Sequence, residues 1–413
     1  MDINELLKGV DCTCGKHHSC DIEAVYIEKG AIRHLTDLCA GYQKILVVAD
    51  ENTFAAAGAQ TLAALEGKAV ETVLFGKEIL VPDEKAVEKV NQSLADADLI
   101  VGIGSGVIQD LCKYVSHTQN VPYMVVATAP SMDGYASNGA AMIMGGMKVT
   151  YSAGLPRALV ADTDVLKNAP LEMLQAGYGD IIGKFSALND WKLSQVVTGE
   201  YFCQYIYDLT YQQIQKNLSL AEGILQRNEE SVKALMEALV IIGILMSFAG
   251  SSRPASGSEH HLSHFFEITG IVEGTEYFPH GIDVAYSTVV TAGIREEILK
   301  KPFPQTQYRP DPAVYQQDMK KIYQSVAEGC MALQEKTGYY TRDFGYKEKE
   351  EAIRQVLAEM PTAKQIEEML RLGGLEMETF YRFYSPEKIE NAKLYAKELK
   401  DRYTVLWIHY AFQ

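Results

Sequence analysis

The sequence predicts an α/β half followed by an all-helical half. Short apolar, β-branched runs alternate with helical patterns up to about residue 165, and long helical patterns with almost no strand signal follow. The change from alternating strand and helix patterns to helical patterns falls near NAP at 168–170, so we expect one domain over 1–167 and a second over 168–413. A chain of 413 residues is also long for a single core, which agrees with two domains.

The expected strands of the first half are continuous apolar runs that end at glycine or polar residues. They lie at 44–50, 72–76, 99–104 and 122–128, with helices expected at 53–67 and 82–96. Apolar strands separated by helices predict a parallel sheet that is covered on both faces. The long helical patterns of the second half cover 171–195, 228–249, 313–336 and 383–403, and a Pro-rich connection is expected at 300–312.

Composition and charge exclude several classes of protein. The net charge is −16 and the pI is about 5.1, which argues against nucleic acid as a partner. The most apolar stretch, 234–250, is short for a membrane span and contains Glu237, so we expect a buried helix and no membrane insertion. The first residues show no signal-peptide pattern, and seven scattered cysteines suit reduced thiols, so we expect a cytoplasmic protein.

One segment near the start is dense in potential soft metal ligands. Cys12 to Cys20 contains five cysteine or histidine residues within nine positions. Structural zinc sites usually combine two separated pairs of ligands, and no second pair follows in the sequence. The pattern therefore favours a surface loop over a metal site, and it leaves the role of the cluster open.

Two loops follow expected strands and are candidates for ligand contact. The first, Gly102–Asp110, brings glycines and a helix start to the end of a strand, where backbone amides can approach a phosphate. It lacks the usual dinucleotide order, because the acidic candidate, Asp50, precedes the glycines. The second, Thr128–Ser137, has small hydroxyl residues around Asp133. Each loop can also be interpreted as a structural turn that binds no ligand.

The strongest constellation is rich in histidine. His260 and His264 are four residues apart in a helical pattern and therefore share one face, and His280 follows closely. Two imidazoles and a carboxylate form a divalent metal site, which the clustering favours over surface histidines. Asp180 is the best carboxylate candidate because an unpaired acid in its apolar surroundings would be costly, and Asp190 is the fallback.

Five segments occur in the order of a known family: GSGVIQD, TAPSMDGYAS, GYGDIIGK, SGSEHHLSH and PHG. Together they resemble the dehydroquinate synthase-like superfamily, which includes glycerol dehydrogenases and iron-dependent alcohol dehydrogenases. Within it, the sequence is most similar to the bacterial branch of the sn-glycerol-1-phosphate dehydrogenases. The resemblance covers nearly the whole chain and implies an N-terminal α/β nucleotide-binding domain and an all-α C-terminal domain.

The resemblance also implies roles for individual residues. Asp180, His260 and His280 would hold one divalent metal ion (zinc, nickel or iron), and Asp133, Asp180 and His264 would act on the substrate. The cofactor, NAD or NADP, would be lined by Asp50, Gly104, Ser105, Gly106, Val107, Ile108, Gln109, Asp110, Thr128, Ala129, Pro130, Ser131 and Ser137. An acidic Asp50 beside the ribose would favour NAD.

Lys184 stands where iron-dependent alcohol dehydrogenases place a fourth ligand, a histidine. A lysine ammonium does not ligate metal, but it can form an ion pair with a phosphate. We therefore hypothesise that a substrate phosphate is bound by Lys184, Arg253 and the segment 251–257. The implied reaction interconverts dihydroxyacetone phosphate and sn-glycerol 1-phosphate. The alternatives are a glycerol or other polyol dehydrogenase of the same superfamily and a non-catalytic metal- or nucleotide-binding regulator. The helical half would suit a homo-oligomer.

Overall fold

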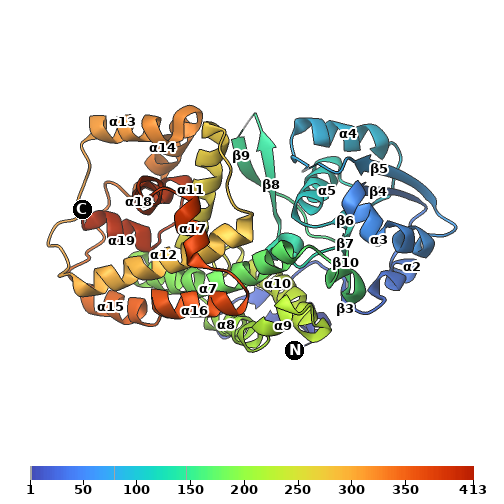
Figure 1. Cartoon of the computed structure of the whole chain (residues 1–413), viewed down its shortest axis with the longest axis horizontal. Coiled ribbons are helices and arrows are strands. Elements are labelled where there is room, and N and C mark those ends of the chain that lie inside the picture. Colours follow the sequence, from blue (N-terminus) through green and yellow to red (C-terminus); the bar gives the residue numbers. More distant parts are fainter. Residues whose placement is uncertain (1, 79, 146) are drawn as a thin grey trace. The chain divides into compact units, whose positions relative to one another are not determined.

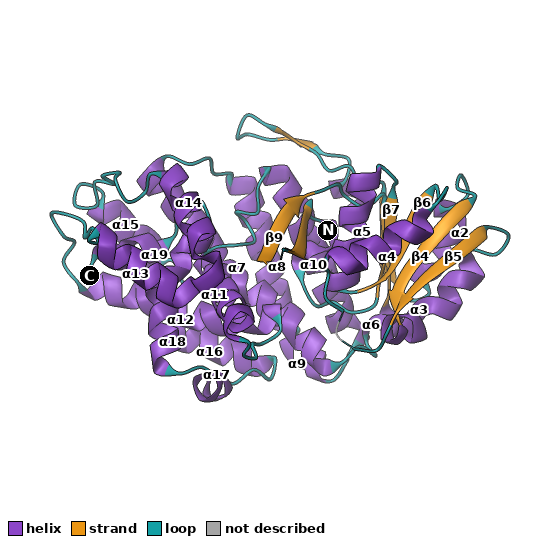
Figure 2. Cartoon of the chain, turned by 90° about the horizontal axis from the view of Figure 1, so that it is seen from above, coloured by secondary structure: helices purple, strands orange, loops and turns teal. Residues whose placement is uncertain are grey.

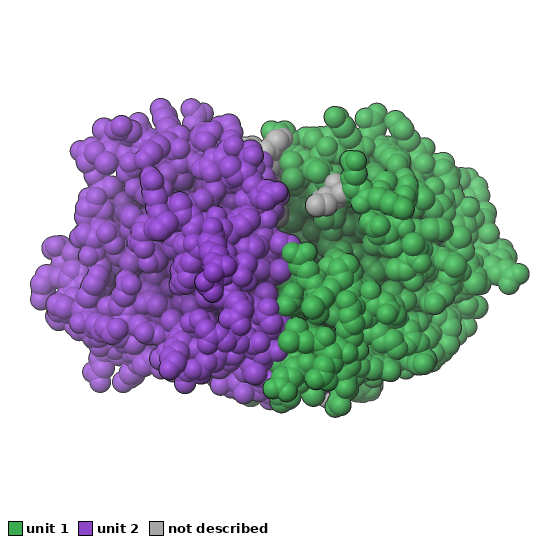
Figure 3. All heavy atoms as spheres, in the orientation of Figure 1, with its two compact units in different colours: residues 1–178, 219–251 green, residues 179–218, 252–413 purple. Residues whose placement is uncertain are grey.

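The computed structural model describes residues 2–78, 80–145 and 147–413. The chain divides into two compact units (Figure 3): Met1–Tyr178 with Ser219–Ser251 form unit 1, and Gly179–Leu218 with Ser252–Gln413 form unit 2. The chain therefore passes between the units more than once. The domains expected at 1–167 and 168–413 stay a prediction. In the structure, the segment 219–251 belongs to the same compact unit as the N-terminal residues.

Unit 1 is built around a six-stranded parallel sheet, which confirms the expected α/β architecture (Figures 1 and 2). In order across the sheet, its strands are β3 (Ala24–Glu28), β10 (Ala158–Asp162), β7 (Tyr123–Ala127), β6 (Leu99–Gly104), β4 (Lys44–Asp50) and β5 (Ala69–Phe75). Every neighbouring pair in this order is parallel. The four expected strands correspond to β4, β5, β6 and β7. The sequence prediction missed β3 and β10.

Alternating side chains of the sheet meet helices on its two faces. Val101 and Ile103 of β6 join one core with residues of α2 (Leu35–Leu38) and α3 (Glu51–Ala64). Gly102, between them, faces α5 (Gly106–Gln119) so closely that a Cβ would lie 2.9 Å from the sulfur of Cys112. Because both faces are covered, the inner strands β4, β6, β7 and β10 are buried almost throughout rather than at alternate residues.

The other elements of unit 1 are short, apart from α4, α10 and the start of α7. They are α1 (Ile3–Leu6), β1 (Val10–Asp11), β2 (His17–His18), η1 (Ala31–His34), α4 (Glu84–Leu94), η2 (Asp133–Ala136), β8 (Gly139–Met144), β9 (Met147–Ser152), α6 (Thr163–Leu166), α9 (Ala221–Leu225) and α10 (Glu229–Ala249). Strands β8 and β9 form an antiparallel hairpin that the sequence reading missed.

Helix α10 contains the apolar stretch 234–250 that was considered as a membrane span. It is the one helix among the described residues that is long and apolar enough to cross a membrane, but 83% of its most apolar window is buried inside the protein. It is a core helix, as expected for 234–250. Its N-cap Asn228 accepts a hydrogen bond from the amide of Glu230, and Gly250 ends it in the left-handed region with φ +68°.

Unit 2 is helical, as expected. Helix α7 (Leu171–Thr198) enters it from unit 1, and α8 (Gln204–Ser219), α11 (Ser258–Glu273) and α12 (His280–Lys300) follow. The remaining helices are α13 (Pro312–Tyr323), η3 (Gln324–Val326), α14 (Ala327–Thr337), α15 (Glu350–Ala358), α16 (Ala363–Leu372), α17 (Met377–Phe383), α18 (Pro386–Tyr395), η4 (Ala396–Leu399) and α19 (Val405–Ala411).

Two of the long helices expected in the second half are interrupted. The pattern over 313–336 is split between α13 and α14, because Gln324 has φ +46° and ends the first helix. The pattern over 383–403 starts as a helix only at Pro386 and ends in the 3₁₀ turn η4. The connection between α12 and α13 lies where the Pro-rich segment was expected.

Candidate active site

Three helices of unit 2 bring a carboxylate and two imidazoles together. Asp180 comes from α7, His260 from α11, and His280 is the first residue of α12, directly after Pro279. One ligand atom from each lies within 4.8 Å of the other two. Asp180 is fully buried, and His260 is 5% exposed. Of the two candidate carboxylates, it is therefore Asp180 that joins the histidines.

The ring of His260 is fixed by its neighbour in the chain. Its Nδ1 lies 2.7 Å from Oε1 of Glu259, so Nδ1 carries the proton and Nε2 presents its lone pair. Nε2 in turn lies 3.5 Å from Oδ1 of Asp180. Burial, followed by the charge of Lys184, holds the pKa of His260 well below its ordinary value. The imidazole is therefore neutral, which is the form that binds a metal.

This donor set fits a divalent metal ion. One carboxylate oxygen and two imidazole nitrogens suit zinc, nickel or iron, and three protein ligands leave coordination positions open for a substrate. A carboxylate that holds the second nitrogen of a histidine, as Glu259 does, is a common support for such ligands. The sequence reading missed Glu259.

Lys184 lies at this cluster as well, one helical turn after Asp180. Its Nζ is fully buried, 2.6 Å from Oδ1 of Asp180 and 3.0 Å from the carbonyl oxygen of Ala255. The ammonium thus offsets the charge of the buried carboxylate. The same spacing of four residues is visible in the sequence, where it was interpreted only as a phosphate contact.

His264 completes a group of three imidazoles. Its ring centroid is 6.2 Å from that of His260 and 5.5 Å from that of His280. It is partly exposed, unlike His260. The spacing of four residues on α11 therefore places a third titratable ring beside the candidate metal ligands, as expected.

Asp190, the fallback ligand, has a different position. Its Oδ2 accepts a hydrogen bond of 2.6 Å from the amide of Ser258, the first residue of α11, and its Oδ1 accepts one of 2.8 Å from the amide of Val405. Arg295 pairs with it at 2.8 Å. These contacts fix the start of α11, and with it the position of His260 two residues later.

Arg253 is held by an ion pair within unit 2. Its Nε lies 2.7 Å from Oε1 of Glu200, a second nitrogen contacts Oε2 of the same carboxylate, and a third lies 2.8 Å from the carbonyl oxygen of Tyr403. The side chain is 3% exposed. These contacts favour a structural role for Arg253 over the expected contact with a substrate phosphate.

Two other cations, which the sequence reading missed, lie against the segment 251–257. Arg402 donates to the carbonyl oxygen of Ser256 at 2.8 Å and to the hydroxyl of Ser252 at 2.9 Å. Lys400 lies 3.4 Å from the hydroxyl of Ser256. Desolvation, followed by repulsion from Arg253, lowers the pKa of Arg402 to about 10. Both cations also lower the pKa of His260.

In unit 1, the two expected cofactor loops lie side by side at the carboxyl edge of the sheet. Gly104 of β6 pairs with Ala127 of β7, and the amide of Thr128 donates to the carbonyl oxygen of Gly104 at 3.3 Å. Ser105 is the N-cap of α5, so the first amides of this 14-residue helix open at the same edge. Gly106, Val107 and Ile108 form its first turn, and Ala129, Pro130 and Ser131 continue the neighbouring loop. A helix start at such an edge suits a phosphate group.

Asp50 ends β4, the next strand along. Its carboxylate accepts hydrogen bonds of 2.9 Å from the amides of Asn52 and Thr53 and caps α3. Because β4 lies beside β6 in the sheet, Asp50 belongs to the same carboxyl edge as Gly104. The role of Asp50 beside a ribose stays a prediction.

Other expected cofactor residues serve the loops themselves. Gln109 is buried and donates to the carbonyl oxygens of Gly102 and Gly104. Lys113, which lies 3.5 Å from Asp110, donates to Gly134 and Gly139 and so supports the segment that contains Asp133 and Ser137. Asp133 starts η2 and is 9% exposed; Ser137, which follows η2, is 8% exposed.

Known structures share this fold. The sulfoacetaldehyde reductase from Bifidobacterium kashiwanohense superposes with a TM-score of 0.62 at 15% identity, covering 96% of this chain and 97% of its own. The glycerol dehydrogenase from Schizosaccharomyces pombe superposes with a TM-score of 0.55 at 17% identity, covering 84% and 91%. Residues 26–170 also match the iron-containing alcohol dehydrogenase family. These likenesses confirm the fold that the motifs implied.

Closer relatives decide the family. A glycerol-1-phosphate dehydrogenase (NAD(P)+) from Halalkalibacterium halodurans is 33% identical over 313 residues, which cover 72% of this chain and 78% of the relative. Another from Bacillus licheniformis is 30% identical over 406 residues, covering 96% and 91%. The chain belongs to the glycerol-1-phosphate dehydrogenase family. A member of this family from Methanosarcina mazei is 36% identical over 245 residues, covering 58% and 68%. The resemblance that the five motifs carried is thereby confirmed.

Proposed function

We propose that this protein interconverts dihydroxyacetone phosphate and sn-glycerol 1-phosphate with NAD or NADP and one divalent metal ion. The observation that carries the proposal is the group of Asp180, His260 and His280, whose ligand atoms lie within 4.8 Å of one another in a member of this family. The three would hold the metal ion, with Glu259 and Lys184 fixing the geometry and charge of two of them.

When bound, a divalent cation supplies Lewis-acid polarisation of the substrate carbonyl, and the reduced nicotinamide supplies the hydride. Reduction of a ketone also requires one proton at the oxygen. His264 is placed to deliver it, since its ring centroid lies 6.2 Å from that of His260 and 5.5 Å from that of His280, and the side chain is partly exposed to solvent. Asp133 would hydrogen-bond a substrate hydroxyl.

The segment 251–257 would bind the substrate phosphate together with Lys400 and Arg402, which contact that segment. Lys184 would add positive charge from the metal cluster. A phosphate dianion offsets the mutual repulsion of several cations, whereas an uncharged polyol does not. This difference favours a phosphorylated substrate over glycerol.

The cofactor would bind at the carboxyl edge of the sheet in unit 1. Its pyrophosphate would lie at the start of α5, and its adenosine ribose beside Asp50. The carboxylate of Asp50 would repel the 2′-phosphate of NADP and so favour NAD. We further propose that the protein works in the cytoplasm as a homo-oligomer, with small molecules as substrates.

The test is NADH oxidation by metal-stripped protein that is re-supplied with zinc, nickel or iron one at a time. We expect activity with dihydroxyacetone phosphate to return with at least one metal, and to exceed activity with dihydroxyacetone by at least tenfold in kcat/KM. Asp180→Asn should bind the metal more weakly and lose at least 100-fold in kcat.

Two outcomes would overturn the proposal in different ways. Equal activity with the phosphorylated and unphosphorylated ketones would indicate a polyol dehydrogenase of the same superfamily. Binding of metal and NADH without oxidation of NADH with either ketone would indicate a non-catalytic regulator.

A further inference from the structure

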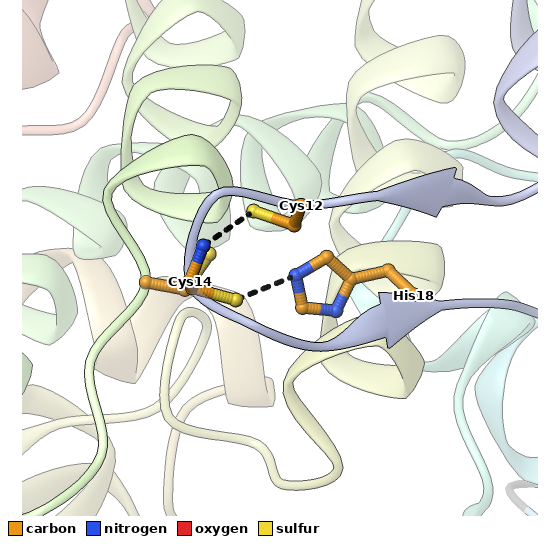
Figure 4. A group of neighbouring side chains, drawn as sticks. Cys12, Cys14 and His18 are labelled. Carbon is orange, nitrogen blue, oxygen red and sulfur yellow. Dashed lines mark hydrogen bonds between the residues drawn. The ribbon is translucent and has the colours of Figure 1, made fainter.

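A second group of metal-ligand side chains lies in the β1–β2 hairpin of unit 1, apart from the Asp180 cluster in sequence and in chemistry. The strands pair antiparallel, with Val10 opposite His18. The connecting turn carries two cysteines toward the ring of His18 (Figure 4). The sulfurs of Cys12 and Cys14 and a ring nitrogen of His18 lie within 4.8 Å of one another. None of the cysteines, all of which lie in described segments, forms a disulfide.

The ring of His18 is oriented as a metal ligand would be. Its Nδ1 lies 2.9 Å from the carbonyl oxygen of Phe248, so Nδ1 carries the proton and donates it. Phe248 belongs to the last turn of α10, whose carbonyl groups have no partner within the helix. The two rings also stack, with centroids 5.4 Å apart. Nε2 is thereby left with its lone pair, 3.4 Å from Sγ of Cys14.

The turn between the strands is shaped to bring the two sulfurs to the same side. The amide of Cys12 donates to the carbonyl oxygen of Lys16 at 3.0 Å, and the amide of Gly15 donates to that of Cys12 at 2.9 Å. Gly15 has φ +88°, a conformation that a side chain would strain. The amide of Cys14 lies 3.5 Å from Sγ of Cys12, a contact that stabilises a thiolate.

The distances between these ligand atoms also suit zinc. Zinc binds thiolate at about 2.3 Å and imidazole at about 2.0–2.1 Å, so tetrahedral geometry puts neighbouring ligand atoms about 3.4–3.8 Å apart. The 3.4 Å between Cys14 and His18 lies within that range. Two soft sulfurs and one imidazole select zinc over magnesium or calcium, which prefer oxygen. A cysteine–histidine pair for nucleophilic chemistry would need no second thiol.

We propose that Cys12, Cys14 and His18 are ligands of a zinc ion, distinct from the metal of the Asp180 cluster. Binding would release the protons of the two thiols and tie the hairpin to the C-terminal end of α10 through His18. The sequence alone favoured a surface loop here, because no second pair of ligands follows. The structure brings the third ligand from β2 instead.

Cobalt is the probe that separates the two metal sites. Full-length protein is stripped of metal, loaded with Co²⁺ and examined by absorption spectroscopy. Sulfur-to-cobalt charge transfer reports the hairpin alone, since the Asp180 cluster contains no sulfur. We expect the band in the wild type and in Asp180→Asn. Cys12→Ser, Cys14→Ser and His18→Asn should each weaken cobalt affinity at the hairpin at least tenfold.

Two matched controls come from the same segment. His17 is exposed and pairs with Asp11 at 2.8 Å, and Cys20 is buried outside the group of three. His17→Asn and Cys20→Ser should therefore keep the band. Absence of a sulfur-to-cobalt band from the wild type at stoichiometric cobalt, or its survival in a Cys12→Ser/Cys14→Ser double variant, would overturn the proposal.

A second measurement needs no variant. Wild-type protein is alkylated at its thiols with and without zinc, and the labelled peptides are identified by mass spectrometry. Zinc should slow the labelling of Cys12 and Cys14 at least tenfold and leave the slower labelling of the buried Cys330 unchanged. Equal labelling of both cysteines in the two conditions would contradict the proposal.

Discussion

Nδ1 of His260 lies 2.7 Å from Oε1 of Glu259, the residue directly before it in α11. The same carboxylate oxygen accepts a hydrogen bond of 2.8 Å from the amide of Gly257. Adjacent residues of a helix point in different directions, so this pairing is not one that helical spacing would suggest. It makes Glu259 the support that sets the orientation of a candidate metal ligand.

The first prediction concerns this support. Glu259→Gln keeps the shape of the side chain but removes the charge that favours a protonated Nδ1, so His260 should become a poorer donor at Nε2. Loss of such a partner typically weakens metal binding by about 10–100-fold. We expect a change of that size in the Kd for zinc, measured by competition with a chelator in the Cys12→Ser/Cys14→Ser background, which lacks the zinc site proposed for the hairpin.

The control for this prediction is Glu273→Gln. Glu273 ends the same helix and pairs with Lys388 at its surface, so its replacement should leave the Kd unchanged. If both variants bind zinc as the wild type does, Glu259 does not support His260.

A second prediction separates the two arginines near the segment 251–257. Arg402 contacts that segment directly, whereas the guanidinium of Arg253 is paired with Glu200. Arg402→Met should therefore raise KM for dihydroxyacetone phosphate at least tenfold more than KM for dihydroxyacetone. Arg253→Met should change both values equally and lower the stability of the protein by about 1–3 kcal/mol, since the partly buried carboxylate of Glu200 loses its arginine partner.

Steady-state kinetics with the two ketones and denaturant unfolding measure these effects. A selective rise in KM with Arg253→Met, together with none for Arg402→Met, would reverse the assignment. It would restore the substrate contact that the sequence indicated for Arg253.

The third prediction concerns cofactor preference. Asp50→Ser removes a negative charge from the carboxyl edge of the sheet but keeps a side-chain oxygen that can cap α3. The ratio of kcat/KM for NADH to that for NADPH should fall at least fivefold, because less repulsion acts on the 2′-phosphate. Asp83 caps α4 in the same way, so Asp83→Ser is the matched control and should leave the ratio unchanged. An unchanged ratio in Asp50→Ser would place the ribose elsewhere.

The sequence predicted the parts of this protein in which the physical signal is local. Apolar runs located β4 and β6, and the spacing of four residues put His260 and His264 on one face of α11. Asp180 stood out because a buried acid needs a partner. The structure supplies one in Lys184, at the next turn of the helix.

The missed parts depend on contacts between distant segments. Arg402 reaches Ser252 and Ser256 from the far end of the sequence, and no local pattern marks that approach. The convergence of Cys12, Cys14 and His18 depends on the pairing of two strands of two residues each, which are too short to show a strand pattern. The ion pair of Arg253 with Glu200 is also a long-range contact that no local pattern marks.

The last prediction concerns stability and pH. Burial lowers the pKa of His409 in α19 to about 4, from an ordinary value of 6.5. Below pH 6.5 the unfolded chain binds a proton at this residue and the folded protein does not, so the free energy of unfolding falls as the pH falls. Between pH 6.5 and 4, this one group should cost about 1.4 kcal/mol for each pH unit.

His409→Leu removes the titrating group and should make the unfolding free energy less dependent on pH by that amount in the same range. Denaturant unfolding of metal-stripped protein at several pH values measures the slope, without a contribution from metal release. His117 is exposed on α5, so His117→Leu is the control and should unfold with the slope of the wild type. If His409→Leu shows the wild-type slope as well, His409 is protonated in the folded protein and its burial does not exclude the charge.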